Sequence, residues 1–187
     1  AKQWGEPDEV VWYERPFRKT LRQLRAGQGW RLRENNIRSY LRHYGISCPI
    51  RYSSHHLSHA AAGYYTSPFT DATVVCIDSI GEFETLTVWE GKGNKLKKKR
   101  SQGYPHSVGL WYSAMTQRIG LKPNEDEYIL MGMAAYGKAN RFYQDILDEF
   151  IEYVGEGKVK FSHNLHRGCQ WWKTGLTSEQ DMYDIAA

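Results

Sequence analysis

Residues 72–78, Ala-Thr-Val-Val-Cys-Ile-Asp, constrain the fold more than any other stretch of this sequence. A continuous apolar run of β-forming residues is typical of a strand whose two faces are both covered. Residues 85–90 then alternate as a half-exposed strand does, and residues 91–94 form a turn from which residues 95–101 pair back. We therefore predict three consecutive antiparallel strands, of which the first is the most buried.

Shorter elements are predicted on both sides of these strands. The patterns predict strands at 9–13 and 49–52, and helices that begin at Pro16 and span 30–44, 106–120 and 127–135. Asn140 is predicted to cap a helix that runs to about residue 153, residues 155–169 an irregular segment with a small hairpin, and residues 177–180 the cap of a last helix. The whole predicts an α/β fold with a mixed sheet and flanking helices.

The size of the chain, 187 residues with 41% hydrophobic, suits one large domain or two small ones. No run approaches the ~18 apolar residues that span a bilayer, and no signal peptide is recognisable, so we expect a soluble, cytoplasmic protein without membrane contact. Cys48, Cys76 and Cys169 lie far apart, which predicts reduced thiols. Because the chain begins at Ala1 and stops within a helical pattern, we expect a fragment of a longer protein.

Positive charge is concentrated in residues 15–42 and 92–100, within a net charge of +4. Such patches attract nucleic acid and other polyanions. A basic helix face and a lysine-rich hairpin edge that resists aggregation explain the two clusters better, because no base-reading motif accompanies them. We therefore do not expect nucleic acid as the main partner.

Three histidines fall within the five residues 55–59. Serines precede them and can cap a helix, and the alanines that follow favour its continuation. On a helix His55 and His59 share one face and can bind one metal ion, although His56, three residues before His59, could replace His55. From spacing alone, two interpretations are about equally favoured. One is a metal or active-site role, and the other is ordinary hydrogen bonding of these rings near a helix start.

Asp78 ends the apolar strand and is followed closely by Gly81 and Glu82. An Asp at a strand end can hold a cation or a hydroxyl, and a nearby Gly lets the backbone approach a phosphoryl group and donate its N–H. The alternative for Asp78 is a turn carboxylate that accepts hydrogen bonds from its own loop. The pair His55 and His59, which has the spacing of metal ligands, lies one crossover connection earlier in the chain. This favours the role of Asp78 in holding a cation or hydroxyl over the turn carboxylate.

Five motifs follow one another between residues 50 and 138. They are His55-His56-Leu57-Ser58-His59-Ala60-Ala61, Ser67-Pro68-Phe69, Asp78-Ser79-Ile80-Gly81-Glu82, residues 105–113 (PHSVGLWYS) and residues 127–137 (EYILMGMAAYG). In their order and spacing these motifs resemble the NodU/CmcH family of O-carbamoyltransferases.

The resemblance implies part of a Kae1-like domain with the actin-like ATPase (ASKHA, ribonuclease H-like) fold. It implies ATP with Mg²⁺ and carbamoyl phosphate as substrates, from which a separate YrdC-like domain makes carbamoyl adenylate. The Kae1-like domain then passes the carbamoyl group to a hydroxyl of a small acceptor, and a homodimer is a further expectation. The rest of this domain and the YrdC-like domain are expected beyond residue 187, so this chain alone is not expected to be active.

For the metal, the resemblance implies His55 and His59 as ligands of Fe²⁺ or a similar divalent ion, with an Asp from further down the chain as third ligand. It implies Asp78 and Glu127 as catalytic residues. An alternative for Glu127 is to anchor a short helix.

Nucleotide or cofactor contacts are implied for Asp78, Gly81, Glu82 and His106. An alternative for His106 is to cap or border a helix. The sequence departs from the family pattern at Ser79, where the family usually has Gly. It also departs at Asp126, Ile129 and Ala135, where Gly, Lys and Pro are usual.

Two further functions stay open at this stage. One is a non-catalytic nucleotide- or metal-binding module with the same fold, and the other is a relative of the threonylcarbamoyl-transferring tRNA-modification enzymes. A downstream Asp ligand and a YrdC-like domain in the full protein would favour the carbamoyltransferase.

Overall fold

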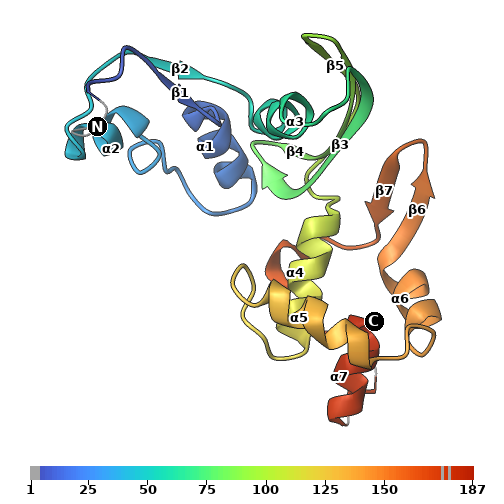
Figure 1. The fold of residues 1–187 in the computed structure, drawn as a ribbon. Helices are drawn as coiled ribbons and strands as arrows, with labels where there is room; N and C mark the ends of the chain where they lie inside the picture. Colours follow the sequence, from blue (N-terminus) through green and yellow to red (C-terminus); the bar gives the residue numbers. More distant parts are fainter. Residues whose placement is uncertain (1–4, 174, 177) are drawn as a thin grey trace. The chain divides into compact units, whose positions relative to one another are not determined.

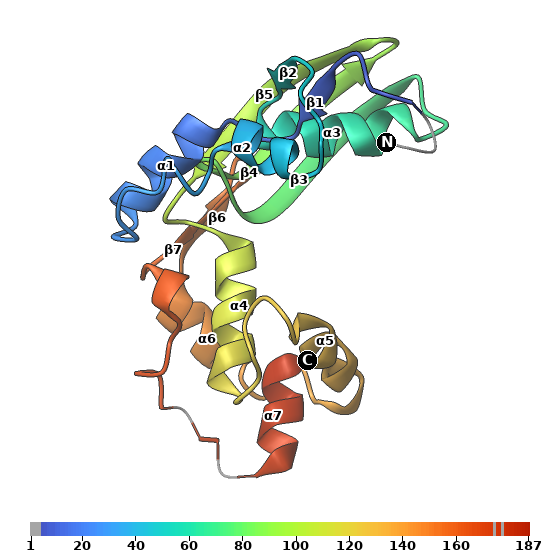
Figure 2. The same cartoon turned by 90° about the vertical axis from the view of Figure 1, so that its left-hand side faces the viewer.

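The structure is a computed structural model that describes residues 5–173, 175–176 and 178–187 (Figure 1). It is a mixed α/β arrangement of small sheets with flanking helices, as predicted (Figure 2). The chain divides into two compact units, which we describe separately. The first comprises residues 1–76 and 81–99, and the second comprises residues 77–80 and 100–187.

The first unit begins with a parallel pair of short strands, β1 (Val10–Trp12) and β2 (Ile50–Tyr52). Between them lie α1 (Pro16–Arg25), with Pro16 in its first turn as predicted, and α2 (Ile37–His43). The helix predicted at 30–44 is wrong in its first half. The Asn36 side chain accepts the Ser39 N–H at 3.1 Å and starts α2 there, because a capping residue outweighs weak helical periodicity.

The three predicted hairpin strands are confirmed as β3 (Asp71–Gly81), β4 (Glu84–Lys92) and β5 (Lys95–Gly103), in the order β3-β4-β5. Two-residue links join them, and only antiparallel strands can be joined by links this short. Residues 77–80 of β3 are counted with the second unit, but they belong to this continuous strand.

The prediction that the first of these strands is the most buried is wrong. β4 is central and carries the fully buried Thr85 and Thr87, whereas Val75 and Ile77 of β3 are 55% and 56% exposed. The apolar run reflects one covered face, which packs on α3 (His55–Tyr65) through a cluster of Ala60, Cys76 and Trp89.

The second unit is mainly helical around one apolar core. Its elements are α4 (Val108–Arg118), α5 (Glu127–Met133), η1 (Ala134–Tyr136), α6 (Tyr143–Phe150), β6 (Ile151–Gly155), β7 (Lys158–Phe161), η2 (Leu165–Arg167) and α7 (Glu179–Ala186). Side chains from α4, α5, α6, β7 and α7 meet in that core, including the fully buried Phe150.

The start of α6 differs from the prediction, and the start of α7 refines it. Asn140 does not cap α6, which begins at Tyr143, and the chain leaves the helix at Phe150 for the β6–β7 hairpin. The cap of α7 is Ser178, whose side chain accepts the Asp181 N–H while Asp181 accepts the Ser178 N–H. Thr177, the first predicted capping residue, lies outside the described residues.

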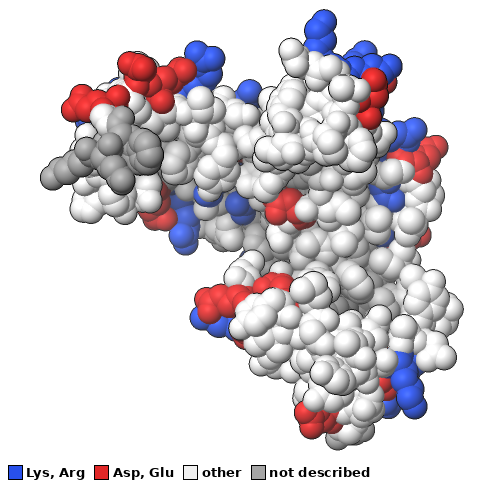
Figure 3. All heavy atoms as spheres, viewed as in Figure 1, with Lys and Arg blue, Asp and Glu red and all other residues white. Residues whose placement is uncertain are grey.

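Two lysines of the second basic cluster pair with carboxylates of the neighbouring strand. Lys98 Nζ lies 2.6 Å from Glu84 Oε1, and Lys99 Nζ lies 2.8 Å from Glu90 Oε2. On the face drawn in Figure 3, basic and acidic side chains are likewise interspersed. This supports the interpretation as a charged hairpin edge. Across the described ranges, every helix is too short or too polar to traverse a bilayer.

Candidate metal centre and adjoining pocket

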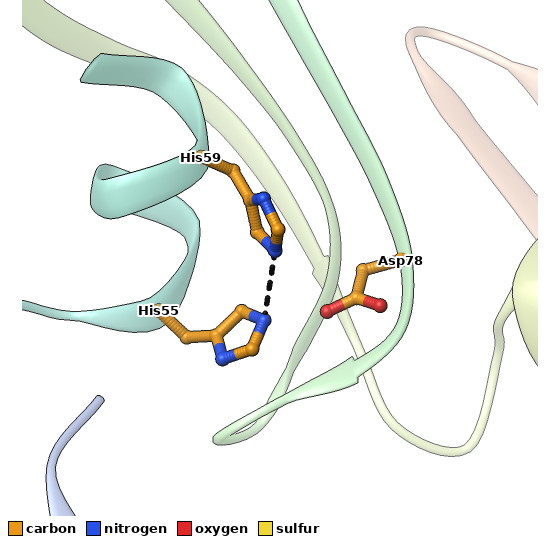
Figure 4. A group of neighbouring side chains, drawn as sticks. All are labelled: His55, His59 and Asp78. Carbon is orange, nitrogen blue, oxygen red and sulfur yellow. Dashed lines mark hydrogen bonds between the residues drawn. The ribbon is translucent and has the colours of Figure 1, made fainter. Parts of the chain in front are cut away.

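His55 and His59 lie one turn apart on α3 and point toward each other (Figure 4). Their Nε2 atoms are 2.9 Å apart. Asp78 of β3 faces this pair, and one ligand atom from each of the three residues lies within 4.8 Å of the others. The structure therefore groups Asp78 with the two predicted histidine ligands. The resemblance places the third ligand further down the chain, so Asp78 adds a carboxylate beside the pair.

The donor set fits a divalent ion. Two imidazoles with a carboxylate suit a borderline metal such as Fe²⁺. Two nitrogens that each lie about 2.05 Å from one ion are about 2.9 Å apart when the angle at the ion is about 90°. In this structure the Nε2 atoms are hydrogen-bonded at 2.9 Å, a separation that an ion between them could also span.

His56 is fully buried and holds α3 on the sheet instead of joining the pair. Its Nδ1 lies 2.9 Å from Thr87 Oγ1, which accepts the Trp89 Nε1–H at 2.8 Å, and its Nε2 lies 3.0 Å from the Glu84 carbonyl oxygen. The simplest proton assignment has Thr87 donate to Nδ1 and Nε2–H donate to Glu84. The sequence left His55 and His56 as alternatives, and this network separates them.

Ser54 occupies the N-cap position of α3, but its side chain makes no capping hydrogen bond. The predicted serine cap is therefore right in position and wrong in mechanism. The hydrogen bonds of His56 to β4 instead fix the start of the helix.

Gly81 lies directly against the histidine rings. A Cβ on Gly81 would come within 2.3 Å of His55 Cδ2 and 2.8 Å of His56 Cδ2. The missing side chain thus makes room for the rings of His55 and His56. The predicted approach of a phosphate at Gly81 stays a prediction.

Glu14, in the link between β1 and α1, is a residue that the sequence analysis did not single out. It is 6% exposed, and its two oxygens face different partners. Oε1 accepts from Lys19 Nζ at 2.5 Å, and Oε2 lies 3.7 Å from His55 Nδ1. Burial acts to raise the pKa of the Glu14 carboxyl, but His55 and Lys19 outweigh it and lower the pKa. No local pattern marks Glu14, because its role depends on a contact 41 residues away.

Glu82 has left-handed backbone geometry (φ 58°) in the β3–β4 turn and is buried. Its Oε1 accepts the Arg15 N–H at 2.8 Å, and its Oε2 lies 3.7 Å from Arg18 Nη1. Glu82 therefore ties the start of α1 to the turn. Its predicted contact to a nucleotide is separate from this role and stays a prediction.

A pocket of about 380 Å³ in the second unit brings Asp78 and Glu127 together. It is lined by Ile77, Asp78, Ser79, Gly109, Tyr112, Ser113, Asn124 and Glu127. The backbone at its floor is fixed by the Ser107 hydroxyl, which lies 3.0 Å from the Asp78 carbonyl oxygen and 2.7 Å from that of Ser79. The two predicted catalytic carboxylates thus line the same open pocket.

Glu127 is held ionised at the start of α5. Burial acts to raise the pKa of its carboxyl, but the Asn124 N–H at 2.6 Å and the Ser113 hydroxyl at 2.8 Å outweigh burial and lower the pKa. A carboxylate with a lowered pKa is a hydrogen-bond acceptor at neutral pH. The helix-anchoring alternative also has support, because both contacts bind Glu127 to neighbouring turns.

His106 faces the β6–β7 hairpin. Its Nδ1 accepts the Phe161 N–H at 3.2 Å, and its carbonyl oxygen accepts from Gln102 Nε2 at 2.8 Å. The cap of α4 is the next residue, Ser107, so His106 borders the helix without capping it. Its predicted contact to a cofactor stays a prediction.

Known proteins similar to this chain are several times longer. A protein of Synechocystis described as uncharacterized, sll1178, is 40% identical over 129 residues, which cover 69% of this chain and 20% of that protein. The nodulation protein NolNO of Sinorhizobium fredii is 28% identical over 143 residues, covering 74% of this chain and 21% of NolNO. NolO of Bradyrhizobium diazoefficiens is 28% identical over 139 residues, covering 72% and 25%. This chain spans between a fifth and a quarter of each.

The model of one protein family, the carbamoyltransferase N-terminus, matches residues 13–182. That range contains Glu14, the histidine pair, and the pocket carboxylates Asp78 and Glu127. The resemblance drawn from the five sequence motifs is thereby confirmed, and the chain belongs to the carbamoyltransferase N-terminus family.

Proposed function

We propose that this chain is part of a Kae1-like domain with the actin-like ATPase fold. It serves an enzyme that uses ATP and carbamoyl phosphate to transfer a carbamoyl group, through carbamoyl adenylate, to a hydroxyl of a small acceptor. The observation that supports this most directly is the grouping of His55, His59 and Asp78 in a chain of the carbamoyltransferase N-terminus family.

In this proposal His55 and His59 hold Fe²⁺ or a similar divalent ion through their Nε2 atoms. When bound, the ion supplies positive charge that neutralises phosphate oxygens and polarises the transferred carbonyl. Asp78 lies beside the pair, where its carboxylate completes the charge balance of the site or orients a group that the ion binds. ATP brings its own Mg²⁺ as part of the substrate.

The acceptor occupies the pocket between Asp78 and Glu127. Its volume of about 380 Å³ falls within the range of about 300–1,000 Å³ typical of small-molecule sites. Asp78 takes the proton of the acceptor hydroxyl, since it is the pocket carboxylate that also faces the metal ligands. Glu127 accepts a hydrogen bond from another polar group of the acceptor and so orients it.

A non-catalytic binding module is the second candidate, and one observation favours it. The Ser79 N–H, at the position where the resembling family usually has Gly, donates to Asp78 Oδ1 at 2.7 Å. In this geometry the Ser79 N–H is already used within the strand end, where the resembling family would have a Gly N–H to donate to a phosphate.

The test uses the full-length protein, with carbamoyl phosphate, ATP and a panel of hydroxyl-bearing sugars. We expect bound metal and carbamoylated product in the wild type, and loss of both in His55→Ala and His59→Ala. His43→Ala, on the exposed end of α2, is the matched control. Unchanged metal content in both site variants refutes the metal site. Metal binding without transfer to any acceptor supports the non-catalytic module, and RNA binding with a steep salt dependence supports the tRNA-modifying alternative.

A further inference from the structure

Glu14 is a buried carboxylate that faces Nδ1 of His55, the ring nitrogen directed away from His59. The imidazole of His55 directs Nε2 toward His59 and Nδ1 toward Glu14, whose Oε2 lies 3.7 Å away. The ring of Tyr13 packs edge-on against the same imidazole, with centroids 5.6 Å apart. His55 is therefore enclosed on the side away from the metal site by the two residues that follow β1.

The position of Glu14 is fixed by its surroundings. Lys19, one turn into α1, binds Oε1 at 2.5 Å and leaves Oε2 directed at His55. The next residue, Arg15, donates its N–H to Glu82 in the β3–β4 turn. The link between β1 and α1 is thus held against the same turn that positions Gly81 beneath the His55 ring.

This arrangement has a chemical consequence for a histidine that binds metal. A neutral imidazole can ligate through Nε2 only when its single proton is on Nδ1, and an acceptor at Nδ1 stabilises that tautomer. A carboxylate acceptor also makes the ligating nitrogen more basic.

We propose that Glu14 is a positioning residue for the metal centre: it accepts the Nδ1–H of His55 and holds this ligand in the tautomer and orientation that metal binding requires. This inference rests on the metal site of the proposed function, and extends it to a residue that touches neither the metal nor the substrates. With a metal held by Nε2, the proton of His55 would lie on Nδ1, and Glu14 Oε2, now 3.7 Å away, would be the carboxylate oxygen that accepts it.

The test measures Co²⁺ affinity of the full-length protein by absorption titration and chelator competition. Glu14→Gln is expected to weaken Co²⁺ binding by about 10–100-fold and to shift the Co²⁺ absorption bands. Glu9→Gln is the matched control, because Glu9 pairs with the exposed Arg51 at 3.1 Å away from the site, and it is expected to bind as wild type does.

A second measurement covers the case in which Glu14→Gln fails to fold. Nitrogen chemical shifts of ¹⁵N-histidine in the Zn²⁺-loaded wild type are expected to place the His55 proton on Nδ1, with a downfield Nδ1–H resonance. A proton on Nε2 of His55 overturns the inference.

The outcomes separate the two proposals. If His55→Ala and His59→Ala lose Co²⁺ but Glu14→Gln binds as tightly as wild type, the inference on Glu14 is wrong and the metal site stands. If the two histidine variants bind Co²⁺ as wild type does, the metal site is wrong and the inference on Glu14 is wrong with it.

Discussion

Substituting Gly81 with Ala tests how closely β3 supports His55 of the proposed metal site. The added Cβ would lie 2.3 Å from His55 Cδ2, where ordinary contact begins at 3.4 Å. The ring must therefore withdraw by about 1.1 Å, and it cannot do so by bending, because an imidazole is rigid. Metal–ligand distances tolerate only about 0.2 Å, so a shift of this size removes His55 from the ligand set.

We expect Gly81→Ala to weaken Co²⁺ binding in the full-length protein by at least about 100-fold, the upper end of the losses caused by displaced outer partners. The same clash is expected to cost about 1–3 kcal/mol of stability, as overpacking does in other cores. Titration with Co²⁺ measures the first effect, and urea denaturation followed by the far-UV signal measures the second.

Gly63→Ala is the matched control within α3. Nothing lies within 4 Å of a Cβ at Gly63, and Ala is the better helix former by about 0.5–1 kcal/mol. This variant is expected to bind Co²⁺ as wild type does and to be slightly more stable. Equal Co²⁺ affinity in Gly81→Ala and Gly63→Ala would refute the reasoning from the close approach of β3 to His55.

Three further variants test other parts of the site and the fold. His56→Leu is expected to lower the free energy of unfolding by roughly 2–5 kcal/mol in urea, since it leaves the Thr87 hydroxyl and the Glu84 carbonyl buried without their partner; a cost below about 1 kcal/mol contradicts the network. Glu127→Gln is expected to raise the KM for the acceptor and leave Co²⁺ affinity unchanged, and the reverse pattern would place Glu127 at the metal instead. Hydrogen bonds from Gln180, Lys138 N–H and Arg141 lower the pKa of Asp184 below its ordinary 3.8, so its stabilising effect is present above pH 3.8 and is lost as the pH falls through the lowered pKa. Asp184→Asn should therefore lower Tm at pH 7 and differ less from wild type at pH 3, with the exposed Asp145→Asn as control; a pH-independent difference contradicts this.

Local signals in the sequence predicted the elements that local interactions determine. Three such features depend only on residues that are close together in the sequence. They are the two-residue links of the β3–β4–β5 hairpins, Pro16 at the start of α1, and the one-turn spacing of His55 and His59. The shared face of His55 and His59 was accordingly predicted correctly, since their Nε2 atoms lie 2.9 Å apart, whereas the metal itself stays a prediction.

The features that the sequence missed depend on contacts between distant segments. Burial of a strand depends on what covers each face, so the apolar run of β3 gave no sign that Val75 and Ile77 are exposed. The choice of His55 over His56 required the position of Thr87 on β4, and Glu14 becomes relevant only because β1 and β2 pair in parallel beside α3. Propensity also misplaced the start of α6, where Asn140 is a good capping residue that the fold does not use.

Asp78 belongs both to the group with His55 and His59 and to the wall of the pocket that contains Glu127. If both ligands bind as proposed, one carboxylate contributes to two equilibria, and its orientation toward one site changes its availability to the other. Thermodynamic linkage then requires reciprocity: whatever factor the metal adds to acceptor affinity, the acceptor must add to metal affinity. Metal affinity measured with and without a bound acceptor would therefore report on the acceptor pocket, even for acceptors that the enzyme does not carbamoylate.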